Sequence, residues 1–225
     1  MDLIREFCAE NMTLVPAAVA AGARRIELCD NLAVGGTTPS HGVIKAAVAF
    51  ARENNAQVMA MMRPRGGGFV YSEAEAGIML DDIRHARDLQ VSGVVLGCLR
   101  VNADGRLLLD AELTKRLVDA AKGPSPNAPL LVTFHMAFDE LDDASQLEAI
   151  DLLASLGVER ILTHGGPLGT PILDHVPHLR ELVHYAGGRI TILPGGGITW
   201  QNAEQVASLL DVHEVHGTKV VRLAP

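Results

Sequence analysis

The sequence predicts an α/β protein with the (β/α)8 architecture of a TIM barrel, and three observations support this fold class. Short apolar, β-branched runs alternate with helical patterns along the chain, which indicates parallel strands joined by right-handed crossovers. The runs recur about every 25–30 residues, as the βα units of such barrels do. Residues that can carry chemistry lie at the C-terminal ends of the predicted strands, where barrels of this class have their active sites.

Eight runs have the apolar, β-branched composition of strands that are buried on both faces of a parallel sheet. The predicted strands span residues 3–8, 25–29, 57–62, 93–98, 130–135, 159–163, 189–194 and 213–219. Helical patterns fill the intervals between them. The predicted helices span residues 13–21, 41–54, 73–89, 111–121, 144–156, 172–185 and 201–210.

Capping residues mark where several of these helices begin and end. Ser40 and Asp110 predict N-caps, and Ser72 with Glu75 predicts a capping box at the start of the third helix. Three glycines are expected to lie between a helix and the strand that follows it, and these are Gly22, Gly93 and Gly157.

Length and composition predict one domain over residues 1–225, because 48% of the residues are hydrophobic and no linker interrupts the pattern. Residues 123–129 predict a surface loop between a helix and a strand. The last predicted strand ends at Lys219, so the eighth outer helix is expected to be missing or very short. The uncovered apolar strand face predicts a homodimer or larger homo-oligomer. A doubly wound open sheet is the alternative, but residues 8–13 lack the glycine-rich nucleotide loop of that fold.

Charge and composition exclude several classes of partner. The net charge is −8, and no more than two basic residues are adjacent, which argues against nucleic acid and against anionic membrane surfaces. Aromatic residues are only 4% of the chain, so base-stacking surfaces are not expected. No apolar run has transmembrane length, and no leader precedes the first strand. The 3 cysteines do not suit a disulfide scaffold, so we expect a cytoplasmic protein with reduced thiols.

The first two predicted strands end in matching Glu-x-Cys motifs, Glu6-Phe7-Cys8 and Glu27-Leu28-Cys29. Alternate residues of a strand share a face, so two carboxylates and two thiols converge if these strands are neighbours. A thiol pair prefers soft metals such as Cu(I), whereas a carboxylate pair can perform acid/base chemistry. The third cysteine, Cys98, is expected to be a small core residue.

Two arginines follow the third strand in the segment Arg63-Pro-Arg-Gly-Gly-Gly. Arg63 is expected to pair with Glu6 or Glu27 in the barrel mouth, and Arg65 to hold a carboxylate or phosphate through its bidentate guanidinium. The alternative is an ion-pair network that only stabilises the top of the barrel, because such networks also perturb charged groups.

Three further strand ends carry candidate site residues. His135 with the nearby Asp139 suits a general base or a metal ligand, and the alternative is a core histidine that is satisfied by a backbone carbonyl. Further histidines, His164 and His216, also follow predicted strands. After the seventh strand, three glycines can bind phosphate through backbone N–H groups, or form only a tight turn. These glycines are Gly195, Gly196 and Gly197.

Several motifs together resemble those of the CutC family, which is described as a family of copper homeostasis proteins. The motifs are Arg-Ile-Glu-Leu-Cys29, Gly35-Gly-Thr-Thr-Pro-Ser40, Arg63-Pro-Arg-Gly-Gly, Thr133-Phe-His-Met-Ala-Phe-Asp139 and Pro194-Gly-Gly-Gly-Ile198. They occur in the family's order over nearly the whole chain. The resemblance implies a cytoplasmic (β/α)8 barrel and a Cu(I) site at the thiols matching Cys8 and Cys29.

The sequence departs from the family pattern at three strand ends. Met136 stands where the family usually has arginine, and His164 where the sixth strand usually ends in Thr-Ser-Gly. The usual His-x-Ser-Ala after the last strand reads His216-Gly-Thr-Lys219. The loss of an arginine and the gain of a histidine change the charge expected at the site.

Two functional hypotheses follow. The first is a copper homeostasis protein in which Cys8 and Cys29 bind Cu(I). The second is a lyase, isomerase or hydrolase that acts on a small anionic, possibly phosphorylated substrate. Its acid/base and substrate-orienting candidates are Glu6, Glu27, Arg63, His135 and Asp139. Its ligand-binding candidates are Arg65, Gly195, Gly196, Gly197 and His216.

Overall fold

The computed structural model describes residues 2–123 and 129–224, and its strands form a nearly closed barrel. Eight parallel strands follow the order β10-β1-β2-β3-β4-β7-β8-β9. They are β1 (Ile4–Glu10), β2 (Arg25–Cys29), β3 (Gln57–Met61), β4 (Gly93–Leu96), β7 (Leu131–Phe134), β8 (Arg160–Thr163), β9 (Thr191–Pro194) and β10 (Glu214–Gly217). Each overlaps one of the predicted strands, so the predicted TIM-barrel fold is confirmed.

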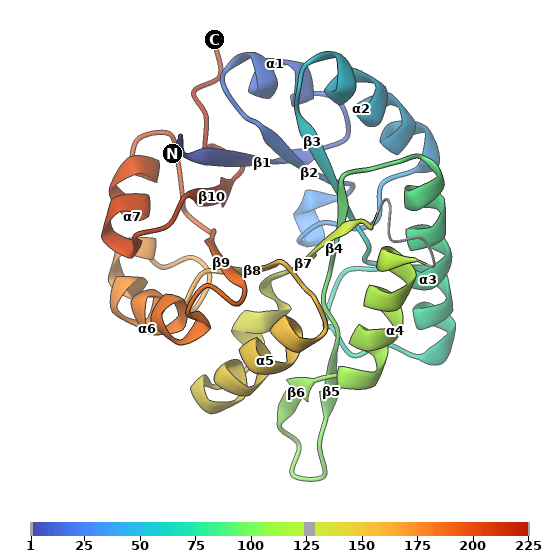
Figure 1. Cartoon of the computed structure of the whole chain (residues 1–225), viewed down its shortest axis with the longest axis vertical. Coiled ribbons are helices and arrows are strands. Elements are labelled where there is room, and N and C mark those ends of the chain that lie inside the picture. The colour runs from blue at the N-terminus through green and yellow to red at the C-terminus, as the bar shows by residue number, and fades with distance from the viewer. Residues whose placement is uncertain (1, 124–128, 225) are drawn as a thin grey trace.

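The helices lie outside the strands and surround the barrel (Figure 1). They are α1 (Val15–Ala20), α2 (His41–Glu53), α3 (Glu73–Asp88), α4 (Ala111–Lys122), α5 (Asp143–Ser155), α6 (Val176–Ala186) and α7 (Ala203–Leu210). Their buried residues pack with the outward-facing residues of the strands in the main core. None of the helices in the described part of the chain has the length and apolar character of a transmembrane helix.

The predicted N-caps are confirmed, but one predicted helix-ending glycine, Gly93, has a different place in the structure. Ser40 and Asp110 accept hydrogen bonds from the backbone of α2 and α4, and Ser72 forms the capping box with Glu75. Gly93 does not end α3, because the residue with positive φ after this helix is Gln90. Gly93 instead begins β4. The predicted loop at residues 123–129 falls mostly on 124–128, which lie outside the described residues.

The structure contains elements that the periodicity did not predict. Between β4 and α4, β5 (Leu99–Val101) and β6 (Leu107–Leu109) form an antiparallel hairpin. The predicted helix over 172–185 is divided into η3 (Ile172–His175) and α6, and Pro177 lies in the first turn of α6. Two further 3₁₀ helices, η1 (Leu32–Val34) and η2 (Met136–Glu140), follow β2 and β7.

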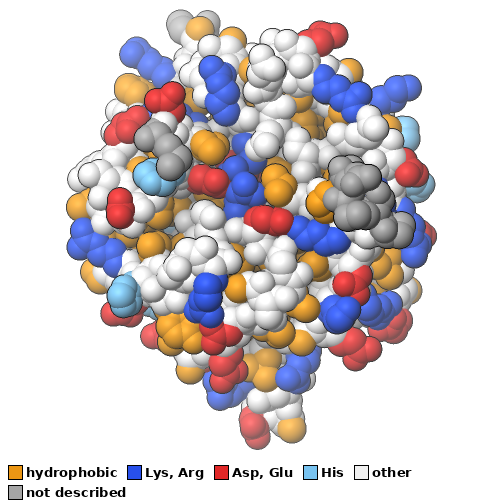
Figure 2. Space-filling model, viewed as in Figure 1, with side chains coloured by type: hydrophobic (Ala, Val, Ile, Leu, Met, Phe, Trp, Pro, Cys, Tyr) orange, Lys and Arg blue, Asp and Glu red, His pale blue; other side chains and the backbone are white. Residues whose placement is uncertain are grey.

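The side of the barrel between α7 and α1 is crossed by the C-terminal segment (Figure 1). After β10, the described residues 218–224 contain no helix, as the fold prediction expected. Val220 and Val221 are nevertheless buried in the main core. This segment therefore covers part of the strand surface that an eighth helix would cover. Figure 2 shows one face of the molecule, where acidic and basic side chains are interspersed.

Strand alternation determines which polar residues enter the barrel. Phe7, Ile26 and Leu28 join the core beneath the helices, so the residues between them face the interior. On β1 and β2 these interior residues include Glu6, Cys8, Arg25, Glu27 and Cys29, all of which are buried. Neighbouring strands continue this interior with Met59, Met61 and Val95, which form a small cluster with the two cysteines.

Candidate functional site

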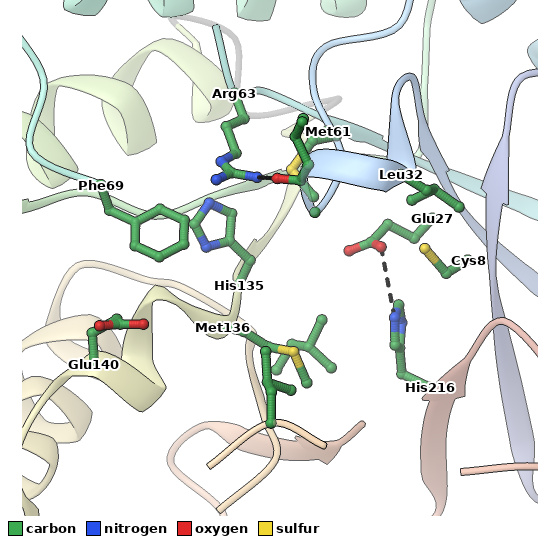
Figure 3. A pocket seen from close by; sticks show the side chains of 14 residues that line it. Cys8, Glu27, Leu32, Met61, Arg63, Phe69, His135, Met136, Glu140 and His216 are labelled. Atoms are coloured by element: carbon green, nitrogen blue, oxygen red, sulfur yellow. Dashed lines mark hydrogen bonds and ion pairs between the residues drawn. The ribbon is translucent and has the colours of Figure 1, made fainter. Parts of the chain in front are cut away.

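A cavity of about 350 Å³ lies at the C-terminal mouth of the barrel (Figure 3). Its polar walls come from β1, β2 and β10 on one side and from the ends of β3 and β7 on the other. The polar residues that line it are Cys8, Glu27, Arg63, His135, Glu140 and His216. Apolar side chains complete the wall, among them Phe69 and Leu162. The cavity is thus where barrels of this class bind ligands.

The two thiols and a carboxylate converge at the base of this cavity. The parallel pairing of β1 with β2 places Cys8 beside Glu27 and Glu10 beside Cys29. The ligand atoms of Cys8, Glu27 and Cys29 all lie within 4.8 Å of one another. Cys29 Sγ donates to Glu27 Oε2 at 3.7 Å. The expectation that strands one and two bring these groups together is confirmed.

His216 lies between the two carboxylates. Its Nδ1 is 2.8 Å from Glu6 Oε1, and its Nε2 is 3.6 Å from Glu27 Oε2. Burial opposes the charged imidazolium, but Glu27, Cys8 and Glu6 together outweigh it and raise the pKa of His216 well above its usual value. His216 is therefore a buried cation that compensates the charge of the two acids.

Glu6 belongs to a buried ion-pair network below the cavity rather than to the cavity wall. The guanidinium of Arg25 bonds Glu6 through Nε and Glu214 through Nη2, the latter at 2.7 Å. Arg160 reaches the same Glu214 oxygen at 2.7 Å. Burial raises the pKa of Glu6, yet Arg25 and His216 outweigh this effect and lower it to about 2. Glu6 is thus held ionised by structural partners.

Glu27 has a different environment from Glu6. Burial raises the pKa of Glu27, His216 opposes this shift, and the charge of Glu6 adds to it. Its Oε1 is buried and has no hydrogen-bond partner among the described residues. Of the two predicted acids, Glu27 is therefore the one that lines the cavity and has free bonding capacity.

The expected pairing of Arg63 with the acids is wrong. Its Nη1 donates to the carbonyls of Val34 at 2.9 Å and Gly36 at 3.0 Å, and its Nη2 donates to Gly67 at 2.6 Å. The guanidinium also stacks over Phe69, 4.9 Å from the ring centroid. Arg63 thus connects the loops after β2 and β3, because the partners within hydrogen-bond distance of its terminal nitrogens are the carbonyls of these loops.

Arg65 is directed into its own loop and does not line the mouth cavity. It pairs with Glu75 and donates to the carbonyls of Gly66, Gly68 and Val70. All three nitrogens of its guanidinium therefore have partners that organise the start of α3.

His135 is a neutral side chain in the wall opposite Glu27. Its Nδ1 accepts a hydrogen bond from the backbone N–H of Ala137 at 3.1 Å, so the ring proton resides on Nε2. That Nε2 is buried and has no partner among the described residues. Burial, and then the charge of Arg63, lower the pKa of His135 to about 3. The ring lies 5.0 Å from Phe69, centroid to centroid.

The expected pair between His135 and Asp139 is not formed. Asp139 instead accepts hydrogen bonds from the Thr163 hydroxyl and from the His164 backbone N–H, the latter at 3.0 Å. His164 in turn bonds through Nδ1 to the carbonyls of Gly195 at 3.1 Å and Gly196 at 3.0 Å. Asp139 therefore connects β7 with β8 and orients the residue that supports the glycine loop.

The glycine loop is positioned beside the cavity. The backbone N–H of Gly195 donates a hydrogen bond to the Thr163 carbonyl at 2.9 Å, and the Gly195 carbonyl bonds His164 Nδ1. Gly196 has a φ of +76°, and a Cβ there would lie 2.7 Å from His164 Nδ1. Within the described residues, Gly195, Gly196 and Gly197 are not part of the cavity lining. His164 thus occupies the position against which the loop packs.

Some residues of the site were missed in the sequence. Arg25 shares a strand face with Glu27 and Cys29, and Glu214 shares one with His216, so alternation could have identified both. Phe69, Leu168 and Glu140 reach the cavity from loops and a 3₁₀ helix, where no periodicity indicates their direction. Cys98 is a core residue, as predicted, with its Sγ 3.1 Å from Thr114 Oγ1.

Comparisons with known proteins agree with the family resemblance. The model of the CutC family matches residues 3–221. A protein named CutC from Enterococcus faecalis is 54% identical over 219 residues, which cover 97% of this chain and 100% of that protein. A crystal structure from Streptococcus agalactiae, described as a candidate copper homeostasis protein CutC, superimposes with a TM-score of 0.89. It is 42% identical, and the match covers 97% of this chain and 100% of that chain.

More distant structures share only the barrel. A tetrameric deoxyribose phosphate aldolase from Aeropyrum pernix matches 97% of this chain and 87% of its own, with a TM-score of 0.68 and 12% identity. Identity at this level shows the fold alone, because TIM barrels support many unrelated chemistries.

Proposed function

Because this chain belongs to the CutC family, we propose that it acts in copper homeostasis by binding Cu(I) through Cys8 and Cys29. One observation carries the proposal: both thiols and the Glu27 carboxylate lie within 4.8 Å of one another in a buried cluster at the barrel mouth. Free thiols at these positions fit a reducing compartment such as the cytoplasm.

The donor set fits a soft monovalent cation. Thiolates prefer Cu(I) to the hard cations Mg²⁺ and Ca²⁺, which select oxygen ligands. A thiolate–metal bond of about 2.3 Å, as in zinc sites, lets one ion join two sulfurs up to about 4.6 Å apart. The two thiols lie within 4.8 Å of each other, which is close to this limit. His216 supplies positive charge close to Cys8, and Arg25 compensates the charge of Glu6, so the two acids oppose thiolate formation less than they otherwise would.

Binding of copper by these thiols must release protons. The hydrogen bond that Cys8 donates to Cys29, burial, and the charge of Glu27 raise the pKa of Cys8 well above its usual value. The pKa of Cys29 is lowered by its bond with Cys8, but burial and Glu27 raise it overall. Both thiols are therefore protonated at neutral pH without metal, and Cu(I) affinity should increase with pH.

Competition with a Cu(I) chelator tests the proposal. Reduced protein is titrated in the presence of the chelator, together with the variants Cys8→Ser and Cys29→Ser. Cys98→Ala is the matched control, since Cys98 is a buried thiol that bonds Thr114 rather than the cluster. We expect affinity to fall in both serine variants and to persist in the control. Unchanged affinity in both serine variants would remove the thiol pair from the proposal.

A second candidate function is an enzyme of lyase, isomerase or hydrolase type in the same cavity. The observation in its favour is that Glu27 and His135 each line the cavity and each have a buried polar atom without a partner in the described part of the chain. Copper transport does not require such atoms, whereas a substrate can satisfy them. An activity lost in His135→Phe but retained in Cys29→Ser would support this function. Equal activity in His135→Phe would contradict it.

A further inference from the structure

The mouth cavity has a mainly apolar wall, and three of its lining residues have a buried polar atom without a hydrogen-bond partner among the described residues; one of these atoms is Arg63 Nε. The other two are Glu27 Oε1 and His135 Nε2, which are buried and have no hydrogen-bond partner among the described residues. Both side chains line the cavity, and the exposed fractions of the two residues are only 3% and 4%. A buried polar atom without a partner is costly, so each atom indicates a missing hydrogen bond.

The two atoms require opposite partners. His135 Nδ1 already accepts from Ala137, so Nε2 carries hydrogen and needs an acceptor. Glu27 Oε2 is engaged by Cys29 and His216, which leaves Oε1 as an acceptor that needs a donor. In Figure 3 the second carboxylate oxygen of Glu27 points toward the open centre of the cavity, and His135 lies across it. One molecule between them needs an acceptor oxygen at one end and a donor at the other.

The charges around the cavity disfavour an anionic ligand. The terminal nitrogens of Arg63 donate to three backbone carbonyls, and His216 is held between Glu6 and Glu27. Glu140 adds a second carboxylate to the lining, in addition to Glu27. A phosphate or carboxylate would therefore meet two carboxylates, and Arg63 would offer it only its Nε. The apolar wall, which includes Phe69 and Leu162, suits an uncharged ligand with an apolar part.

We propose that this cavity binds a small uncharged hydroxycarbonyl compound. Its carbonyl oxygen accepts a hydrogen bond from His135 Nε2, its hydroxyl donates to Glu27 Oε1, and its apolar part packs against Phe69. Small rotations of Glu27 and His135 accompany binding, because both atoms are covered in the free protein. The cavity volume of about 350 Å³ lies at the small end of the range for ligand sites. The inference shares its cavity with the second candidate function, but it requires neither turnover nor copper.

A series of related probes tests the proposal on reduced, copper-free protein. The probe is 2-hydroxyacetophenone, which carries a phenyl ring, a carbonyl and a hydroxyl. Acetophenone lacks the hydroxyl, 2-phenylethanol lacks the carbonyl, and phenyl phosphate is the anionic comparison. Dissociation constants are measured by ligand-observed NMR. We expect 2-hydroxyacetophenone to bind about 5-fold more tightly than each of the first two, the factor for one hydrogen bond, and more tightly than phenyl phosphate.

Two variants locate the binding. His135→Phe keeps an aromatic ring but removes Nε2, so it should weaken the binding of 2-hydroxyacetophenone and leave the binding of 2-phenylethanol unchanged. His184→Ala, at an exposed position of α6, should change neither. If His135→Phe does not fold, the dissociation constants of the probes for the unmodified protein still test the proposal. Tighter binding of phenyl phosphate, equal binding of the ketones with and without hydroxyl, or no saturable binding of 2-hydroxyacetophenone would each overturn the proposal.

The same measurement separates this inference from the copper proposal. Cys29 is not among the residues that line the cavity in the described part of the chain. Serine keeps a donor for Glu27 Oε2, so Cys29→Ser should lose copper affinity and retain 2-hydroxyacetophenone binding. Loss of both ligands in a folded Cys29→Ser variant would contradict the independence of the two sites.

Discussion

Cys8 lies beside Glu27 in the parallel pairing of β1 and β2, and both side chains are buried in the mouth of the barrel. Cys8 and Glu27 therefore lie together at the base of the cavity. Cys29 and His216 are close to the Glu27 carboxylate. Soft and hard ligand atoms at one place are the basis of both proposals, a copper ion held by the thiols and an organic ligand held by Glu27.

The first prediction concerns the cation between the acids. His216→Gln keeps hydrogen-bonding capacity but removes the positive charge that Glu6 and Glu27 share. Breaking a buried ion pair in this way should lower the free energy of unfolding by about 3 kcal/mol. Urea unfolding at pH 7 measures the change, with His184→Ala as the surface control. A loss no larger than that of the control would show that the acids do not depend on His216.

The second prediction concerns pH and His135. Its pKa is about 3 in the folded protein, below its usual value of 6.5, so the unfolded chain binds a proton that the folded protein does not. Stability should therefore fall as pH decreases from about 6.5, by about 1.4 kcal/mol per pH unit from this group.

His135→Gln removes this group and should lose less stability over the same interval. The comparison is made by urea unfolding between pH 6.5 and pH 4.5, where the other groups titrate equally in both proteins. Parallel pH profiles for the two proteins would contradict the assignment of a neutral, buried imidazole.

The third prediction concerns the link between two loops. Arg63→Lys leaves one ammonium where a guanidinium now reaches the carbonyls of Val34, Gly36 and Gly67. We expect a loss of about 2 kcal/mol in the free energy of unfolding, because buried carbonyls lose charged donors. Hydrogen exchange should become faster at residues 33–37 and 66–69. Exchange that is unchanged there would show that Arg63 does not hold the loops.

Strand alternation was enough to place several site residues from the sequence. It directed Glu6, Cys8, Glu27 and Cys29 to the barrel interior, and their adjacency followed once β1 and β2 were neighbours. The same rule applies to Arg25, whose pairing with Glu6 is a consequence of sharing its face. The alternation of side chains along each strand is thus enough to predict which residues face the interior of the barrel.

The partners of residues after the strands could not be predicted in this way. Arg63 is satisfied by carbonyls of two loops, and Asp139 by a hydroxyl and an N–H at the end of β8. These contacts depend on the path of irregular backbone, which has no period in the sequence. The sequence pattern can suggest that an arginine pairs with an acid at a neighbouring strand end. It cannot show that backbone carbonyls of the loops lie closer to the guanidinium than the acid does.

The fourth prediction concerns assembly. The C-terminal segment covers only part of the side between α7 and α1, and Trp200, which donates its backbone N–H to the Lys219 carbonyl of this segment, is 44% exposed. We expect a homodimer or larger homo-oligomer to cover this side, since exposed apolar side chains favour association. Light scattering at micromolar concentration should give a mass above that of one chain, and Trp200→Glu should reduce it. A single-chain mass for the unmodified protein would contradict the prediction.

The coordination of copper tests the central claim most directly. Protein loaded with one equivalent of Cu(I) is studied by X-ray absorption at the copper edge, alongside the Cys8→Ser, Cys29→Ser double variant. We predict a first shell of sulfur from Cys8 and Cys29 that disappears in the double variant. A first shell of nitrogen and oxygen, or one that is the same in both proteins, would contradict a thiolate copper site at the barrel mouth.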